Sequence, residues 1–250
     1  MKIAYICTNF NNSDLTVSAV ASIAADTSHD VSIFVVDNAS DENHRRTLQK
    51  LLRDDPRVHV IFNELNIGYF AGLNVGIEAA RSEGKGIDWM VIGNNDLVFS
   101  VDFIESIDKM QNDFINYCVI SPDIITLDGA HQNPHVISNI SPLREIFYDL
   151  YFLNYYLGMT IQRIARLIPS LTRRGDEDEW RIPQKIYQGH GACYLLTPKF
   201  FDYFDSLWAP TFMMGEEFFL SLQLNSVFAL EGTKFKNGVL QHCAFLLKLT

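Results

Sequence analysis

The sequence of 250 residues has no excess of basic side chains. It contains 20 Lys and Arg against 30 Asp and Glu, which gives a formal net charge of −10. Broad binding to the phosphate backbone of nucleic acid needs a basic surface, so we expect no nucleic-acid partner. A small phosphorylated ligand remains compatible with this charge if a metal ion or backbone amides hold it.

The sequence also lacks paired cysteines and long apolar runs. Its four cysteines form no CxxC pair, and we interpret them as reduced thiols of a cytosolic protein: Cys7, Cys118, Cys193 and Cys243. The apolar stretch after Lys2 is too short for the core of a secretory signal, and no run approaches the roughly 20 residues of a transmembrane helix. We therefore expect a cytoplasmic location.

What the sequence does have is a regular alternation of two patterns over its first 120 residues. Apolar, β-branched runs predict strands at 2–8, 31–36, 58–62, 89–92 and 117–120. Apolar residues at helical spacing predict four helices. The first begins near Ser13 and Asp14, and the others cover 41–52, 70–81 and 101–110. This βαβα order predicts an α/β fold with a mixed, mainly parallel sheet flanked by helices.

The alternation stops at about residue 123, where a polar, turn-rich stretch begins. An aromatic-rich helical segment at 144–168 and a charged stretch at 169–183 follow, after which regular structure resumes. There we expect a strand at 191–196, helices at 198–207 and 216–224, and a last strand around Val239. We interpret the chain as a single domain, 1–250, with halves at 1–122 and 123–250 and a helical insertion at about 141–183.

Polar residues gather where the expected strands end, and in an open α/β sheet such ends face one crevice. Asp37 can accept hydrogen bonds from a base or a ribose hydroxyl there, or it can form an Asx turn that caps the next helix. The segment from Asn66 to Asn74 leads into a helix. Its Gly68 and Gly72 allow a diphosphate to approach the helix N-terminus, although such loops are also common turns.

A second polar group, Asn94-Asn95-Asp96, follows the strand at 89–92. A carboxylate at the end of a strand can hold a divalent cation against phosphate oxygens, or it can cap the following helix. His242 lies in an apolar strand, where a histidine is either a core residue or, with Asp96 nearby, an additional metal ligand.

Glu216 and Glu217 begin the predicted helix at 216–224. Adjacent side chains on a helix point about 100° apart, so the two carboxylates should have different roles. One can face the crevice and take a proton, while the other pins a loop or a sugar hydroxyl. The alternative is a pair of charges that stabilises the helix N-terminus.

The order of these motifs resembles the family 2 glycosyltransferases of the GT-A fold, a Rossmann-like architecture. It is most similar to the bacterial branch that builds surface polysaccharides with rhamnose or related sugars. The resemblance runs from about Lys2 to His242. Five segments carry it: Val36-Asp37-Asn38-Ala39-Ser40, the segment 66–74, Asn95-Asp96, the segment 191–196 and Gly215-Glu216-Glu217.

The resemblance implies an inverting transfer of a sugar from a UDP-, dTDP- or GDP-linked donor to a hydroxyl of a glycan or lipid-linked acceptor. The first half would bind the nucleotide sugar, with an acceptor-binding second half. The implied donor-binding residues are Thr8, Asn9, Asp37, Asn38, Asn66, Gly68, Gly72, Asn74, Asn95 and Asp96. Gly191 and Ala192 would line the acceptor side, Glu217 would be the general base beside Glu216, and Asp96 with His242 would hold Mn²⁺ or Mg²⁺.

The sequence departs from this family at several positions, which keeps a non-catalytic nucleotide-sugar-binding module open as an alternative. Asn94 replaces the first acid of the DxD-type motif, and the base position is Glu rather than the commoner Asp. Phe219-Leu220 and Gln223 replace the family's Asp-Leu and Arg. A nucleotidyltransferase is disfavoured because no basic residue follows the first strand. The aromatic stretch at 144–168 would contact a lipid-linked acceptor at the inner face of the membrane, pack on the sheet, or form a homodimer interface.

Overall fold

The structure is a computed structural model that describes residues 1–84, 86–133, 151, 153–156, 158–160, 163, 183–230 and 239–249. Side chains are described up to residue 226, so the last strand is known by its backbone only. The expected helical insertion at about 141–183 lies almost entirely outside the described residues.

The first half of the chain alternates strand and helix as its sequence predicts. The strands are β1 (Lys2–Asn9), β2 (Asp30–Asp37), β3 (Val58–Phe62) and β4 (Trp89–Gly93). The helices between them are α1 (Ser13–Ala24), α2 (Glu42–Asp54) and α3 (Tyr69–Ser82). The strands pair in parallel, in the order β3-β2-β1-β4, so their C-terminal ends share one edge of the sheet.

The chain after β4 completes the sheet and adds strands of both directions. Its elements are β5 (Leu97–Phe99), α4 (Phe103–Phe114), β6 (Val119–Ile125), β7 (Gln184–Ile186), β8 (Cys193–Leu196), α8 (Pro198–Phe201), α9 (Glu216–Leu230) and β9 (Val239–Leu249). The sheet continues from β4 as β8-β6-β9-β5, and β7 pairs with β9. Because β8 is antiparallel to both β4 and β6, β6 and its parallel partner β9 run in the direction of β1. The sheet is therefore mixed, with most of its strands pointing the same way.

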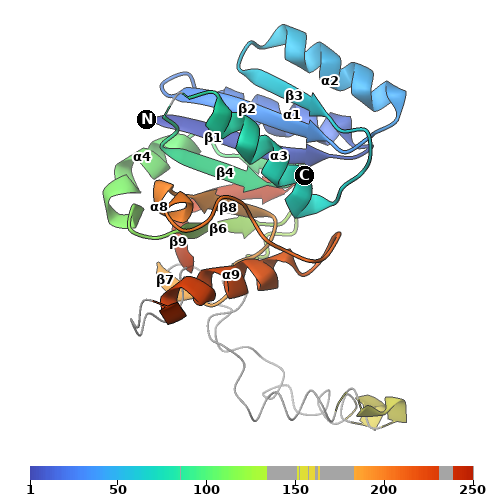
Figure 1. Cartoon of the computed structure of the whole chain (residues 1–250), viewed down its shortest axis with the longest axis vertical. Coiled ribbons are helices and arrows are strands. Elements are labelled where there is room, and N and C mark those ends of the chain that lie inside the picture. Colours follow the sequence, from blue (N-terminus) through green and yellow to red (C-terminus); the bar gives the residue numbers. More distant parts are fainter. Residues whose placement is uncertain are drawn as a thin grey trace.

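Strand β1 shows why the sheet carries helices on both faces. Its side chains are buried on both sides, and successive side chains point to opposite faces. Tyr5 belongs to a core with α1 and α4, whereas Ile6 belongs to a second core with α3, α8 and α9. Helix α3 crosses in front of the sheet in Figure 1. Both faces are thus covered, which leaves the edge at the strand ends as the place for a site.

Three expectations about the chain after β4 are corrected by the structure. Strand β6 continues to Ile125 instead of giving way to turns at 123, because Ile124 is fully buried and pairs with β9. Helix α8 ends at Phe201 rather than at Leu207, whose backbone pairs with a side chain of α3. The short strands β5 and β7 were not expected, since each is defined by pairing with the distant β9.

The structure also gives findings on the cysteines and on membrane-spanning helices. Cys7, Cys118 and Cys193 are buried free thiols, as predicted, while the side chain of Cys243 lies outside the description. Among the described residues, no helix combines the length and the apolarity that crossing a bilayer requires.

Candidate active site

A cavity of about 640 Å³ opens at the edge of the sheet where β1, β2 and β4 end and where β8 begins. This is the position at which open α/β sheets bind ligands. The described residues that line it include most of the predicted site residues: Thr8, Asn9, Asn38, Asn66, Gly68, Gly191, Ala192, Glu216 and Glu217. Segments as distant as residues 8 and 217 therefore meet at one place.

The wall also contains residues that our sequence analysis did not select. They are Phe10, Tyr69, Asn94, His190, Met213, Met214 and Gly215. Each lies within three residues of a predicted site residue. No Lys or Arg is found among the described residues of the wall.

Asp37 lies behind this wall rather than in it. Its side chain is fully buried; Oδ1 accepts a hydrogen bond from Asn9 Nδ2 at 2.9 Å, and Oδ2 accepts one from the Ser40 backbone N–H at 3.2 Å. Arg45 Nε is 3.7 Å from Oδ2. Asp37 thus positions Asn9 and the turn after β2, which agrees with the Asx-turn alternative rather than with direct contact to a base.

Asn38 lines the cavity and ties two loops together. Its Nδ2 donates to the Gly68 carbonyl at 3.0 Å, and its Oδ1 accepts from Asn63 Nδ2 at 2.9 Å. The side chain is 4% exposed, so these bonds are shielded from water. Asn38 therefore fixes the approach to α3 beside the end of β1.

Two backbone amides at the start of α3, where a diphosphate was expected, are used by the protein itself. The Gly68 N–H donates to Asn66 Oδ1 at 3.1 Å, and the Tyr69 N–H donates to the Phe212 carbonyl at 3.0 Å. Gly68 has φ +94°, and a Cβ there would lie 2.3 Å from that same carbonyl oxygen. Position 68 therefore requires glycine for its backbone conformation and for the close approach of the 212 loop.

Gly72 and Asn74 serve packing and loop anchoring. A Cβ on Gly72 would lie 2.7 Å from Thr8 Cγ2, so this glycine lets α3 pack closely on β1. Asn74 donates from Nδ2 to the Leu207 carbonyl and accepts at Oδ1 from the Leu207 N–H, both at 2.8 Å. Asn74 faces a separate hollow beside Asp205, so its position does not support a role in donor binding.

Asn95 and Asp96 follow β4, and neither is among the residues that line the cavity. Asn95 Nδ2 donates to Thr16 Oγ1 at 2.7 Å and contacts Asn9 Oδ1 at 3.3 Å, which joins it to the network around Asp37. Burial is the main reason that the pKa of Asp96 is raised, and a hydrogen bond from the Asn94 side chain partly offsets it. Asn94 reaches the cavity wall, two residues before this carboxylate.

A sharp turn directly before α9 places Glu216 and Glu217 at the cavity. Met214 has φ +74° and Gly215 has φ +81°, so two successive residues are left-handed immediately before α9. Such a conformation is uncommon for a long side chain like Met and tends to occur at functional sites. The first two residues of α9, Glu216 and Glu217, then both line the cavity.

The two glutamates have different surroundings. Glu216 is 4% exposed, whereas Glu217 is only partly buried. Burial raises the pKa of Glu216, and the nearby Glu217 adds to the rise, while backbone N–H groups of Glu216 and Met214 act in the opposite direction. Glu216 Oε1 is buried without a hydrogen-bond partner among the described residues. The predicted division of roles is thus matched by a difference in environment.

Glu217 lies against the loop that precedes β8. A Cβ placed on Gly191 would come within 3.3 Å of Glu217 Oε2, and the Gly191 carbonyl accepts a hydrogen bond from Tyr69 Oη at 3.2 Å. The same loop is held by Tyr194 Oη, which donates to the Gly189 carbonyl at 2.9 Å. The carboxylate of Glu217 is thus set opposite an open, small-residue surface where a second substrate could lie.

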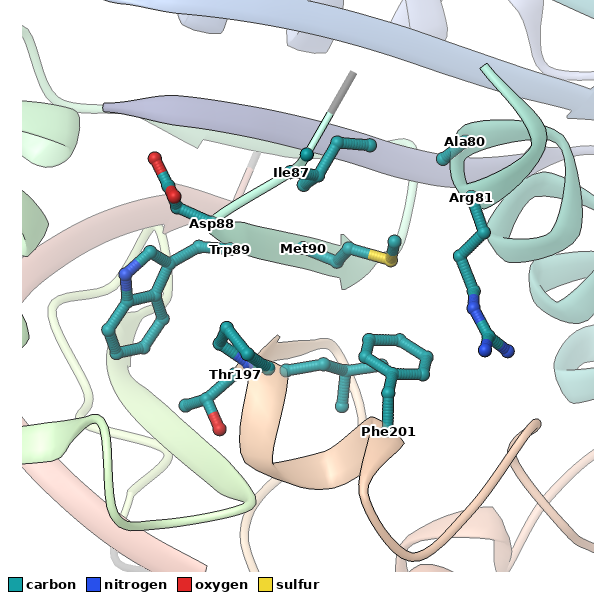
Figure 2. A pocket seen from close by; sticks show the side chains of 11 residues that line it. Ala80, Arg81, Ile87, Asp88, Trp89, Met90, Thr197 and Phe201 are labelled. Carbon is teal, nitrogen blue, oxygen red and sulfur yellow. The ribbon is translucent and has the colours of Figure 1, made fainter. Parts of the chain in front are cut away.

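A second cavity, of about 260 Å³, lies at the opposite end of β4, near Trp89 and Met90 (Figure 2). Figure 2 shows Arg81 extending from α3 toward Phe201 of α8, and the guanidinium carbon is 4.8 Å from the centre of that ring. The described wall of this second cavity holds one carboxylate, Asp88, whose Oδ2 accepts a hydrogen bond from the Lys2 backbone N–H at 2.8 Å. It offers no acid pair, so the 640 Å³ cavity is the candidate active site.

The fit of the site to Mn²⁺ or Mg²⁺ depends on a donor set that the described residues do not complete. They contain no group of three or more His, Cys, Asp or Glu side chains able to hold a metal ion. The backbone of His242 pairs with Pro122 in the sheet, but its side chain lies outside the description. Asp96 is therefore the one described member of the expected pair of metal ligands, and the described protein alone does not fit a resident metal.

Comparison with known proteins agrees with this architecture. The family model for glycosyl transferase family 2 matches residues 5–179, and the chain belongs to this family. A comparison with curated proteins finds no match.

Solved structures with similar folds include three glycosyltransferases. TarS of S. aureus (residues 1–349) superposes with a TM-score of 0.57 at 11% identity, covering 100% of this chain and 60% of that one. GalNAc-T7 with UDP, GalNAc and Mn²⁺ gives 0.59 at 13%, covering 100% and 44%. The mannosyltransferase PcManGT of Pyrobaculum calidifontis, in complex with GDP-Man and Mn²⁺, gives 0.53 at 12%, covering 96% and 56%. This chain thus spans about half the length of these proteins, and the likeness establishes the GT-A fold.

Proposed function

We propose that the protein is an inverting glycosyltransferase that moves a hexosyl or deoxyhexosyl group from a nucleoside diphosphate to a hydroxyl of a glycan or lipid-linked acceptor. The observation that carries the proposal is the meeting, in one cavity, of the ends of β1, β2 and β4 with the Glu216-Glu217 pair and the Gly191 loop. Family membership supports the same reaction class.

In the proposed reaction, the acceptor hydroxyl attacks the anomeric carbon from the face opposite the nucleotide. A new C–O bond forms, the bond to the diphosphate oxygen breaks, and its electron pair leaves with the nucleoside diphosphate. Glu217 takes the proton of the hydroxyl, a contribution of roughly 10²–10⁴-fold for a positioned base. Its partial exposure beside Gly191 gives an acceptor access to the carboxylate.

The donor would lie along Thr8, Asn9, Asn38 and the Asn66–Gly68 loop, which line the same cavity. Asp37 and Asn95 would act from behind by holding Asn9. The wall offers amides and hydroxyls but no described Lys or Arg to meet the diphosphate charge. A divalent cation brought by the diphosphate and held at Asp96 would offset that charge.

The donor is proposed to carry uridine, thymidine or guanosine, and the acceptor to belong to a bacterial surface polysaccharide. Contact of the segment at 144–168 with a membrane, and pairing through it with a second copy, stay predictions because that segment lies almost entirely outside the described residues. The cytoplasmic location likewise stays a prediction.

The proposed function is tested by incubating the protein with UDP-, dTDP- and GDP-linked hexoses and Mn²⁺ and measuring release of the free nucleoside diphosphate. Glu217→Gln should lower this release at least about 100-fold while leaving nucleotide affinity within about twofold. With a methyl glycoside added as acceptor, nuclear magnetic resonance of the new glycoside should show inverted anomeric configuration, whereas free sugar from hydrolysis would lose its configuration by mutarotation.

A non-catalytic nucleotide-sugar-binding module predicts a different pattern. Nucleotide sugars would then raise the melting temperature by mass action without release of nucleoside diphosphate. Near-normal release by Glu217→Gln would instead leave the glycosyltransferase in place and reject Glu217 as its base.

A further inference from the structure

We infer that Glu216 binds a sugar hydroxyl through its unpartnered oxygen and thereby positions the sugar for transfer. This inference deepens the proposed function and rests on it. It gives the first member of the acidic pair a role separate from the proton transfer assigned to Glu217. The hydroxyl can belong to the donor sugar or to the acceptor sugar, and the experiment below distinguishes the two.

The first observation is the state of the Glu216 carboxyl group. Its side chain lines the cavity and is 4% exposed, yet Oε1 has no hydrogen-bond partner among the described residues. Removing a carboxylate oxygen from water without a replacement partner is costly, and buried polar atoms in native proteins are nearly always paired. An unpaired oxygen in the wall of a binding cavity is therefore best explained by a partner that arrives with the ligand.

The second observation is that the hydroxyl groups of the two nearest tyrosines are used elsewhere. Tyr69 Oη donates to the Gly191 carbonyl at 3.2 Å, and Tyr194 Oη donates to the Gly189 carbonyl at 2.9 Å. Burial is the main reason that the pKa of each tyrosine hydroxyl is raised, and the charge of Glu216 is a smaller contribution for both. A small rotation of either tyrosine toward Glu216 would break a hydrogen bond that holds the loop before β8.

The third observation is the backbone that presents the carboxyl group. Met214 and Gly215 are both left-handed, and Glu216 follows them directly as the first residue of α9. This turn fixes the place at which the chain brings Glu216 to the cavity wall before any ligand binds, which is what a positioning residue needs.

The chemistry of the wall indicates which sugars suit this oxygen. The described wall holds two carboxylates and no Lys or Arg, so a sugar that carries its own carboxylate would be repelled. A neutral hexose or deoxyhexose offers hydroxyl donors that a carboxylate oxygen accepts strongly. The inference thus assigns a neutral sugar to this position and excludes a uronic acid.

The test compares wild type, Glu216→Gln and the exposed-site control Glu64→Gln by isothermal titration calorimetry. In the donor arm, affinities for UDP and GDP are compared with those for UDP-glucose, UDP-glucuronic acid, GDP-mannose and dTDP-rhamnose. In the acceptor arm, methyl glycosides of glucose, galactose, mannose and rhamnose are titrated into protein saturated with nucleoside diphosphate. Thermal unfolding of each variant reports whether the fold is intact.

We expect Glu216→Gln to weaken sugar binding about 10- to 100-fold in one of the two arms, since it replaces a hydrogen bond to a charged group. The affinity for UDP or GDP alone should stay within about twofold, and the control should match wild type. The arm in which the affinity changes shows whether Glu216 binds the donor sugar or the acceptor sugar. Deoxy analogues then identify the hydroxyl, because its removal should cost little further in Glu216→Gln.

Unchanged sugar affinity in both arms for a folded Glu216→Gln variant would overturn the inference. If the donor arm is the one that changes, equal wild-type affinity for UDP-glucose and UDP-glucuronic acid would overturn it as well. Failure of the proposed function looks different, because wild type itself would then bind no nucleotide sugar more tightly than the nucleotide and would release no nucleoside diphosphate.

Discussion

Gly191 lies directly against the carboxylate of Glu217: a Cβ at position 191 would be 3.3 Å from Glu217 Oε2 and 3.9 Å from its Cδ. The nearest atom to the added carbon is thus the far end of a flexible side chain, which can move. We predict that Gly191→Ala leaves the protein folded but displaces the carboxylate. Turnover should fall about 10- to 100-fold, because a small misplacement of a catalytic group has a large effect on rate.

The measurement is kcat for nucleoside diphosphate release, together with nucleotide affinity and melting temperature, both of which should be close to those of wild type. Glu217→Asp provides the matched background, since its carboxylate is withdrawn by one methylene. Gly191→Ala should cost less in that background than in wild type. Fully additive losses would show that the alanine acts on something other than the Glu217 carboxylate.

The paired hydrogen bonds between Asn74 and Leu207 give a prediction about stability. Asn74→Ala leaves the partly buried N–H and carbonyl of Leu207 unpaired, which should lower the free energy of unfolding by about 1–3 kcal/mol. Asn74→Asp keeps the acceptor for the Leu207 N–H but sets a carboxylate oxygen against the Leu207 carbonyl, so it should not restore the lost stability. Urea unfolding measures both variants. Donor affinity should not change in either variant. A tenfold weaker donor affinity at unchanged stability would show that Asn74 takes part in donor binding.

This pair also shows how far the sequence could predict the site. The order of motifs was enough to place Glu216, Glu217 and the Gly191 loop at one crevice, because strand ends in an α/β sheet share an edge. It could not show that the amide of Asn74 is used by a backbone 133 residues away, or that Asn95 joins a network behind β1. An Asn looks the same in sequence whether it binds a ligand or a loop.

The same limit explains the strands and the helix that were missed. The apolar runs of β1, β2 and β4 were recognised because burial on both faces leaves a continuous hydrophobic signal. Strands β5 and β7 have three residues each and owe their identity to pairing with β9, which local pattern cannot show. Helix α8 was predicted too long because tertiary contacts of Leu207 override helical spacing.

The charge of the cavity leads to a prediction about metal binding. The described wall has no Lys or Arg, the amides of Gly68 and Tyr69 at the start of α3 are already used, and the described residues form no metal cluster. Metal and diphosphate should therefore depend on each other for binding. We predict that Mn²⁺ binds at least about tenfold more tightly in the presence of UDP or GDP, and that the nucleotide gains by the same factor.

Calorimetric titration of Mn²⁺ with and without nucleotide measures this coupling, and EDTA provides the metal-free reference. Asp96→Asn should reduce the coupling, because it removes the one described carboxylate expected to hold the ion. Tight Mn²⁺ binding to the nucleotide-free protein, or nucleotide affinity that EDTA leaves unchanged, would contradict the prediction.

The buried carboxyl group of Glu216 predicts how stability depends on pH. Its pKa in the folded protein is raised from an ordinary value near 4.5, first by burial and then by Glu217. Its contribution to stability is therefore fully present below pH 4.5 and is lost as the pH rises through the raised folded value. Glu216→Gln does not titrate, so in the absence of ligand the free energy of unfolding of this variant, relative to wild type, should increase from pH 4.5 to neutral pH and then level off. Denaturant unfolding across this range measures the difference, with Glu64→Gln showing the effect of removing a carboxylate at an exposed position. A difference that falls with rising pH would mean that the folded protein stabilises the ionised form of Glu216, and the buried oxygen would then already have a partner.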